Sequence, residues 1–152
     1  MTALALALST SFGVGYVPIA PGTFGSAAGV LLWMFLPGSS IAQVLSVLLV
    51  FAVGSWAAHV TERHYQRTDP GVVVIDEVLG MLITLAFNPV GWPGLVVGFL
   101  LFRVFDVVKP YPANRLERLH GGLGIMADDA MAGLYANIVL RFGIAVLPAG
   151  TL

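Results

Sequence analysis

Several carboxylates of this chain lie inside strongly apolar stretches, where a charge is costly unless something positive binds it. Five of the eight acidic residues fall in the runs VVVIDEVLGM, FRVFDVVKP and GIMADDAMAG. An unpaired charge in such surroundings costs several kcal/mol. The five acids, which we predict to be both catalytic and metal-binding, are Asp76, Glu77, Asp106, Asp128 and Asp129.

Two cations lie in the same part of the sequence, but they cannot balance five carboxylates. These are Arg103 and Lys109. The deficit predicts a bound divalent cation. Carboxylate oxygens without neighbouring histidine or cysteine ligands suit Mg²⁺ or Mn²⁺ better than zinc. We therefore expect Mg²⁺ as the cofactor, with Mn²⁺ as an alternative ion.

The stretch FRVFDVVKPYP places three charges at spacings of three residues at the end of an apolar run. On a helix this spacing puts Arg103, Asp106 and Lys109 on one face. Arg103 offers a planar fork for phosphate oxygens, and Lys109 offers a compact charge near the membrane surface. Asp106 can bind metal or orient the arginine, and the prolines that follow end the helix. This face is typical of a metal-assisted phosphate site.

Glycine-rich turns precede two of the apolar segments. The sequences APGTFGS and HGGLG leave backbone N–H groups free at helix N-termini, where an anion can bind. We predict that Gly22 and Thr23 contact a phosphate there. In addition, Gly80 and Gly133 each follow an acidic residue by four positions, a spacing that lets transmembrane helices approach closely.

The elements that must position these residues are apolar helices. The chain is 58% hydrophobic and only 10% charged, with a mean hydropathy of +0.92. Too few polar side chains remain to cover a soluble domain, so we predict an all-α, polytopic membrane helix bundle with four to five membrane segments. Residues 1–20, broken by glycine and proline, form an interfacial or re-entrant piece in this interpretation. The apolar segments span residues 24–36, 41–58, 72–88, 94–108 and 124–147.

The charges between the segments predict an orientation. Lysine and arginine gather in HVTERHYQRTDPG and KPYPANRLERLHGG, whereas LPGSS and NPVGWPG carry no charge. The positive-inside rule places both basic connections in the cytoplasm. The five acids then lie one to two helical turns from the cytoplasmic boundary, so we expect a multi-pass protein with its active site at the cytoplasmic face.

Composition also excludes some classes of function. A net charge of −1 without a basic tail argues against a nucleic-acid partner. The absence of cysteine excludes disulfides and thiolate sites. The N-terminus lacks the basic region of a signal peptide, so we interpret it as mature sequence. No repeat or linker divides the chain, so residues 1–152 form one predicted domain, and no obligate protein partner is inferred.

Four stretches together resemble the bacterial phosphatidylglycerophosphatase A family. They are GYVPIAPGTFGS, VVVIDEVLGMLIT, FRVFDVVKPYP and HGGLGIMADDAMAG, in order along residues 12–140. The chain departs from the family pattern in lacking a basic N-terminal extension. Residues 59–70 match loosely, so no role is carried over to His59 or His64.

The resemblance implies an all-helical protein of the bacterial cytoplasmic membrane. It also implies a Mg²⁺-dependent activity that converts the membrane phospholipid phosphatidylglycerophosphate to phosphatidylglycerol and inorganic phosphate. By motif position, the family's acids fall on the five carboxylates, its basic pair on Arg103 and Lys109, and its Pro-Gly-Thr turn on Pro21, Gly22 and Thr23.

Other interpretations remain open at this point. The nucleophile is either water or an aspartate that forms a phosphoaspartyl intermediate. Other lipid-phosphate enzymes are an alternative, although the signatures of CDP-alcohol phosphotransferases and of histidine-dependent lipid phosphatases are absent. An ion or proton transporter would use the intramembrane acids as a relay. A relay should distribute polar groups across the bilayer, but only Thr84, Asn137 and Arg141 lie deeper.

Overall fold

The computed structural model describes residues 1–116, 119, 121–148 and 151–152, and every regular element in these ranges is helical. The predicted all-α fold is therefore confirmed. Glu117, Arg118 and His120, which belong to the second basic connection, lie outside the described residues. The elements are α1 (Thr2–Ser9), the 3₁₀ helix η1 (Val14–Tyr16), α2 (Pro21–Phe35), α3 (Ser40–Tyr65), α4 (Ile75–Leu85), α5 (Trp92–Val108), α6 (Ala113–Leu116) and α7 (Gly122–Val146).

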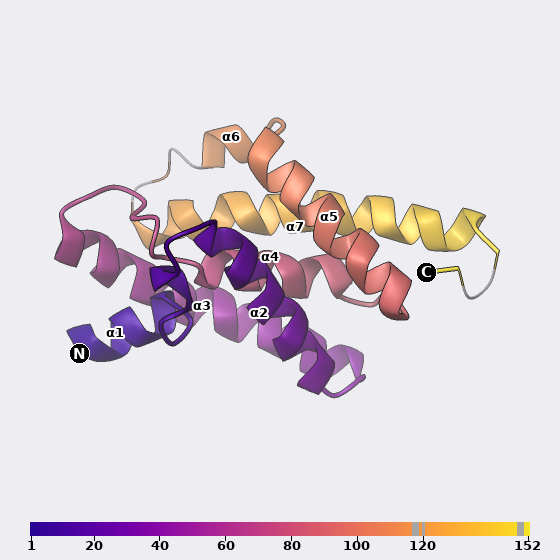
Figure 1. Cartoon of the computed structure of the whole chain (residues 1–152), viewed down its shortest axis with the longest axis horizontal. Helices are drawn as coiled ribbons and strands as arrows, with labels where there is room; N and C mark the ends of the chain where they lie inside the picture. Colours follow the sequence, from indigo (N-terminus) through magenta and orange to yellow (C-terminus); the bar gives the residue numbers. More distant parts are fainter. Residues whose placement is uncertain (117–118, 120, 149–150) are drawn as a thin grey trace.

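A short central helix organises the bundle. Helix α4 packs against α2, α3, α5 and α7, and nine of its 11 residues are buried. Helices α3, α4 and α7 run along the long axis of the molecule, and α2 and α5 lie diagonally across α4 and α7 (Figure 1). The first turn of α4 carries two of the predicted site residues, so the most enclosed helix also positions them.

Glycines bring the two central helices into contact. A Cβ atom on Gly133 of α7 would lie 2.5 Å from the carbonyl oxygen of Gly80 on α4, which is closer than a real side chain can approach. The predicted close approach of helices at these two glycines is thus present. On the other side of α4, Gly29 of α2 lies against Val78 and Met81 in the same way.

Helix α4 ends inside the protein, where its last carbonyl groups need donors. The side-chain nitrogen of Asn137 on α7 donates to the carbonyl oxygens of Ile83 (2.9 Å), Thr84 (3.0 Å) and Ala86 (2.8 Å). An unsatisfied carbonyl in an apolar interior costs free energy. The asparagine therefore lets a helix that is too short to span a bilayer end at this depth.

The five predicted apolar segments correspond to helices α2, α3, α4, α5 and α7. Helices α3 and α7 are long and apolar enough to cross a membrane, judged by length and composition. Four to five spans stay a prediction, because α4 covers a shorter range than the apolar segment 72–88 that contains it. At the N-terminus, α1 packs along α3 through a hydrogen bond between the hydroxyl groups of Ser9 and Thr61 (2.7 Å).

Apolar side chains are also exposed on the outer faces of the bundle. On α5 they recur at Trp92, Val96, Leu100, Val104 and Val107, a spacing of three to four residues. Arg103 lies three residues after Leu100 and four before Val107, so it emerges beside this stripe, and Asp106 lies further round the helix. Helix α5 therefore carries its site charges next to an exposed apolar face.

Candidate active site

The ends of four helices enclose a polar cavity of about 810 Å³. Its wall includes the start of α2, the start of α4, the end of α5 and the first turns of α7. Eight of the predicted site residues line it: Gly22, Asp76, Glu77, Arg103, Asp106, Lys109, Asp128 and Asp129. The ninth, Thr23, is exposed and does not line the cavity.

Three carboxylates meet in one group that could hold a metal ion. One oxygen from each of Asp76, Glu77 and Asp129 lies within 4.8 Å of the other two. Asp76 and Glu77 come from the first turn of α4, and Asp129 comes from the adjacent part of α7. Each of the three carboxylates also has one buried oxygen without a hydrogen-bond partner among the described residues. These unpartnered oxygens fit a hard divalent cation, which prefers oxygen ligands.

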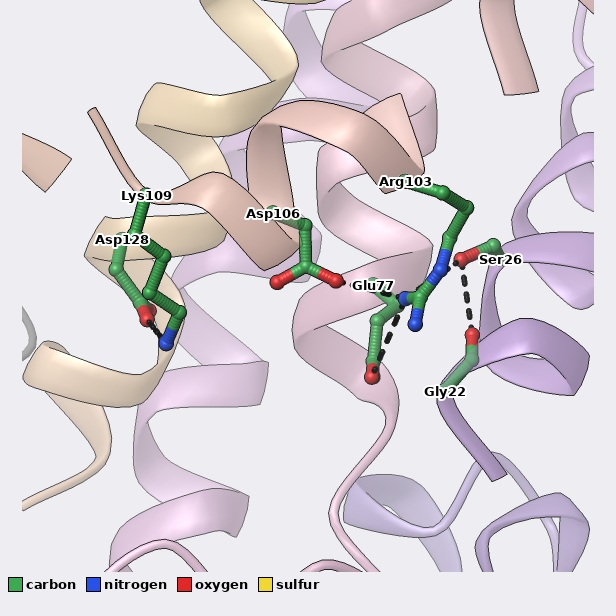
Figure 2. Close-up of polar contacts among 7 residues, drawn as sticks. All are labelled: Gly22, Ser26, Glu77, Arg103, Asp106, Lys109 and Asp128. Carbon is green, nitrogen blue, oxygen red and sulfur yellow. Dashed lines mark hydrogen bonds and ion pairs between the residues drawn. The ribbon is translucent and has the colours of Figure 1, made fainter. Parts of the chain in front are cut away.

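The other two predicted acids each form an ion pair with a cation. Arg103 Nη1 lies 2.7 Å from Asp106 Oδ2, and Lys109 Nζ lies 2.6 Å from Asp128 Oδ2 (Figure 2). The structure thus brings all five acids to one cavity but gives Asp106 and Asp128 cationic partners. Their role as metal ligands stays a prediction.

Arg103 reaches from α5 across to α2 and α4. Besides Asp106, its Nη1 atom contacts Glu77 Oε1 at 3.9 Å and Ser26 Oγ at 3.5 Å. The Ser26 hydroxyl donates in turn to the carbonyl oxygen of Gly22 at 2.8 Å, as Figure 2 shows. The guanidinium group is therefore fixed between two acids and the first turn of α2.

Lys109 ends α5 in a conformation that returns its side chain to the cavity. It is the C-cap residue, with φ of 45°, and its backbone N–H donates to the carbonyl of Phe105 at 2.9 Å. Pro110 follows and cannot continue the helix. The ammonium group lies against Asp128 on α7. The helix ending and the ion pair together bring a surface lysine into the site.

Negative charge dominates the cavity. Among the described residues, seven carboxylates and two cations line it. The two acids that the sequence analysis did not assign to the site are Glu62 and Asp69, which come from the end of α3 and from the connection after it. Like charges this close repel unless cations bind between them. The charge balance therefore favours a bound cation.

Ser26 is a further site residue that the sequence analysis did not identify. It is fully buried and lies one helical turn after Gly22. The available signal was its i, i+4 spacing from the Pro-Gly-Thr turn, which places both residues on one face of a helix. Without the position of α5, however, nothing in the sequence connects this serine with Arg103.

The polar residues that were predicted to lie deeper than the acids, Thr84, Asn137 and Arg141, contact backbone carbonyl groups. Thr84 Oγ1 donates to the carbonyl of Gly80 at 2.8 Å, and Arg141 lies 3.4 Å from the carbonyl of Phe87. Asn137 donates to the end of α4, as described above. These contacts serve helix termination and packing, and they do not extend the acidic group across the bundle.

Comparisons with known proteins indicate the family of the chain. Residues 7–144 match the family model described as phosphatidylglycerophosphatase A. A protein of that name from Escherichia coli is 39% identical over 89% of this chain and 80% of its own length. Another from Haemophilus influenzae is 37% identical, covering 88% and 84%. A putative phosphatidylinositol-3-phosphatase from Bacteroides thetaiotaomicron is 38% identical, covering 90% and 91%. No solved structure is significantly similar to the chain.

Proposed function

The chain belongs to the phosphatidylglycerophosphatase A family and is a phosphoric monoester hydrolase, and from this premise we propose its substrate, cofactor and site. It removes the terminal phosphate of phosphatidylglycerophosphate and yields phosphatidylglycerol and inorganic phosphate, a step of phospholipid biosynthesis. The reaction takes place in the acidic cavity and depends on Mg²⁺. Three carboxylates with unpartnered buried oxygens are the observation that carries this proposal.

Asp76, Glu77 and Asp129 would hold the ion. When bound, Mg²⁺ polarises a phosphoryl oxygen and neutralises charge that develops on the phosphate. The protein's own cations, Arg103 and Lys109, supply further positive charge at opposite sides of this group. Their carboxylate partners hold them in place before substrate binds, which reduces the reorganisation needed during the reaction.

Two nucleophiles are consistent with the cavity. In one route a water oxygen attacks phosphorus, the bond from phosphorus to the glycerol oxygen breaks, and that oxygen takes up a proton. In the other route a carboxylate attacks phosphorus, the bond to the glycerol oxygen breaks and that oxygen takes up a proton; water then hydrolyses the acyl phosphate to inorganic phosphate and the free carboxylate. Asp128 Oδ1 is buried without a hydrogen-bond partner among the described residues, so a candidate base or nucleophile is available. Rapid acid quenching with substrate labelled in the terminal phosphate would distinguish the routes by trapping a phosphoprotein.

The site lies at the cytoplasmic face of a multi-pass membrane protein in this proposal. Two membrane-capable helices and the bacterial relatives indicate a membrane protein. Exposed apolar side chains on α2 and α5 support lipid contact beyond those two helices. The acids on α4, α5 and α7 lie at the helix ends that join the basic connections, which supports the cytoplasmic orientation.

The two alternative classes differ in how well the structure supports them. The deeper polar side chains contact backbone carbonyls, so a proton or ion relay has little support. Another phosphorylated lipid is favoured as a second candidate by the relative described as a putative phosphatidylinositol-3-phosphatase. We therefore include phosphatidylinositol 3-phosphate as a competing substrate in the test.

The test measures phosphate release by detergent-purified protein from phosphatidylglycerophosphate, with Mg²⁺, with Mn²⁺ and with EDTA. We expect release to require the divalent ion and to be abolished by Asp129→Asn. The matched control is Arg67→Gln, which removes a charge from an exposed position outside the cavity and should act as the wild type does. Faster release from phosphatidylinositol 3-phosphate would replace the proposed substrate, and no release from either lipid by folded protein would refute the proposal.

A further inference from the structure

The cavity has a cation at each of two separate ends. Figure 2 shows Arg103 beside Ser26 and Glu77 at one end, Lys109 beside Asp128 at the other, and Asp106 between them. Both cations come from α5 and lie six residues apart, which is about 9 Å along the helix axis. The two backbone positions are thus far enough apart for each cation to serve a different phosphate group.

The three-carboxylate group lies between these ends. On one side, Glu77 Oε1 is 3.9 Å from Arg103. On the other side, Asp129 directly follows Asp128, which binds Lys109. The group is therefore linked to the arginine through Glu77 and adjoins, along α7, the aspartate that binds the lysine. A phosphate bound at the carboxylate group has a second cation available on each side.

The two ends differ in their position relative to the membrane. Arg103 lies within α5, next to the exposed apolar side chains of Leu100 and Val104 on the same helix. Phe24 of α2, on the other side of Ser26, is also exposed. Lys109 is the C-cap residue that follows α5, where the chain turns into the basic connection. The arginine end is thus nearer the bilayer and the lysine end nearer the cytoplasm.

Phosphatidylglycerophosphate carries two phosphates in the same order. Its phosphodiester adjoins the diacylglycerol in the bilayer, and a glycerol bridge separates it from the terminal phosphomonoester. Resting on the proposed function, we propose that Arg103 binds the phosphodiester, which the reaction leaves intact, while Lys109 binds the phosphomonoester that is removed. Arg103 is then a determinant of specificity for lipids with two phosphates.

The chemistry of each cation fits its assigned phosphate. A guanidinium fork can bind both free oxygens of a phosphodiester, while Asp106 and Ser26 hold the fork in place. A compact ammonium group acts as a point charge and can follow a phosphomonoester as its geometry changes. Ser26 is then a positioning residue, because it acts on the lipid through Arg103.

The two products of the reaction can probe the two subsites separately, because each product carries one of the two phosphates. Phosphatidylglycerol carries only the phosphodiester, and inorganic phosphate carries only the group that is removed. Dihexanoyl phosphatidylglycerol and inorganic phosphate are titrated separately into purified protein with Mg²⁺ by isothermal calorimetry, which requires no turnover. Dihexanoyl glycerol measures the contribution of the acyl chains alone, and Arg67→Gln is the matched charge control.

We expect Arg103→Gln and Lys109→Gln to change the ratio of the affinity for phosphatidylglycerol to the affinity for phosphate in opposite directions. Arg103→Gln should lower the affinity for phosphatidylglycerol relative to phosphate by roughly tenfold or more, the effect of losing a hydrogen bond to a charged group. Lys109→Gln should raise the same ratio by a similar factor. If Arg103→Gln does not fold, Arg103→Lys keeps the charge and should shift the ratio in the same direction by less.

Equal losses of both ligands in both variants, or the opposite assignment, would overturn the division between Arg103 and Lys109. Hydrolysis by the wild type tests the proposed function separately. Wild-type protein that hydrolyses phosphatidylglycerophosphate, with variants that leave the ratio unchanged, would refute only this inference. Wild-type protein that hydrolyses no phosphatidylglycerophosphate would refute the proposed function on which it rests.

Discussion

Magnesium should reverse the sign of the effect that Asp129→Asn has on stability. Asp129 is 4% exposed, and its Oδ2 atom has no hydrogen-bond partner among the described residues. Its carboxylate lies within 4.8 Å of those of Asp76 and Glu77. At this separation each ionised pair repels by roughly 3.5 kcal/mol for an effective dielectric constant of about 20.

Without metal, the asparagine removes two of these repulsions. Side-chain relaxation reduces the gain, and single substitutions rarely change stability by more than about 3 kcal/mol. We therefore expect the variant to be more stable than the wild type by about 1–3 kcal/mol in EDTA. With Mg²⁺ at a thousand times its dissociation constant, the wild type should gain about 4.1 kcal/mol. The variant lacks one of the three ligands and should gain much less, so the order of stabilities reverses.

The measurement is the free energy of unfolding in detergent micelles, followed by circular dichroism in EDTA and over a Mg²⁺ titration. Arg67→Gln, which lies outside the cavity, should show the same Mg²⁺ dependence as the wild type. A variant that is less stable than the wild type in EDTA would show that repulsion among these carboxylates is not the dominant effect. A variant stabilised by Mg²⁺ as strongly as the wild type would refute the metal-binding group.

Two further predictions concern the placement of α4. Gly133→Ala puts a methyl group 2.5 Å from the carbonyl oxygen of Gly80, so it should separate α4 from α7, destabilise the protein by about 1–3 kcal/mol and reduce phosphate release. The matched control is Gly38→Ala, where the added methyl group meets no atom within 4 Å; equal losses in both would contradict the packing argument. Asn137→Leu removes the donor to the Ala86 carbonyl and should lower the free energy of unfolding by about 1–3 kcal/mol, as measured by denaturant titration. An unchanged unfolding free energy would mean that other groups satisfy this end of α4.

The helices and the general position of the site could be predicted from the sequence. Helices α2, α3, α5 and α7 can be located from apolar runs that lie between glycine, proline and charged connections. This is possible because the pattern of apolar residues within a short window indicates a helix. The acids stand out because charge is rare in such runs. Their similar distances from the basic connections predicted one site, and the structure brings all five to one cavity.

The pairing of charges within that cavity could not be predicted in the same way. Asp106 and Asp128 look the same in sequence as the three acids that meet in one group, yet they pair with Arg103 and Lys109. The difference depends on how α5 and α7 are rotated about their axes relative to α4. That rotation is set by contacts between residues far apart in the chain.

The sequence by itself determined an all-helical, apolar protein with five carboxylates gathered toward one end, since composition, spacing and charge placement are local properties. Only the tertiary structure decided that α4 ends within the protein, that Ser26 reaches Arg103, and that the two cations occupy opposite ends of the cavity. These features arise where glycines allow backbones to approach, as at Gly80 and Gly133. Close packing between distant segments fixes the direction of each side chain, and the pattern along one segment does not contain that information.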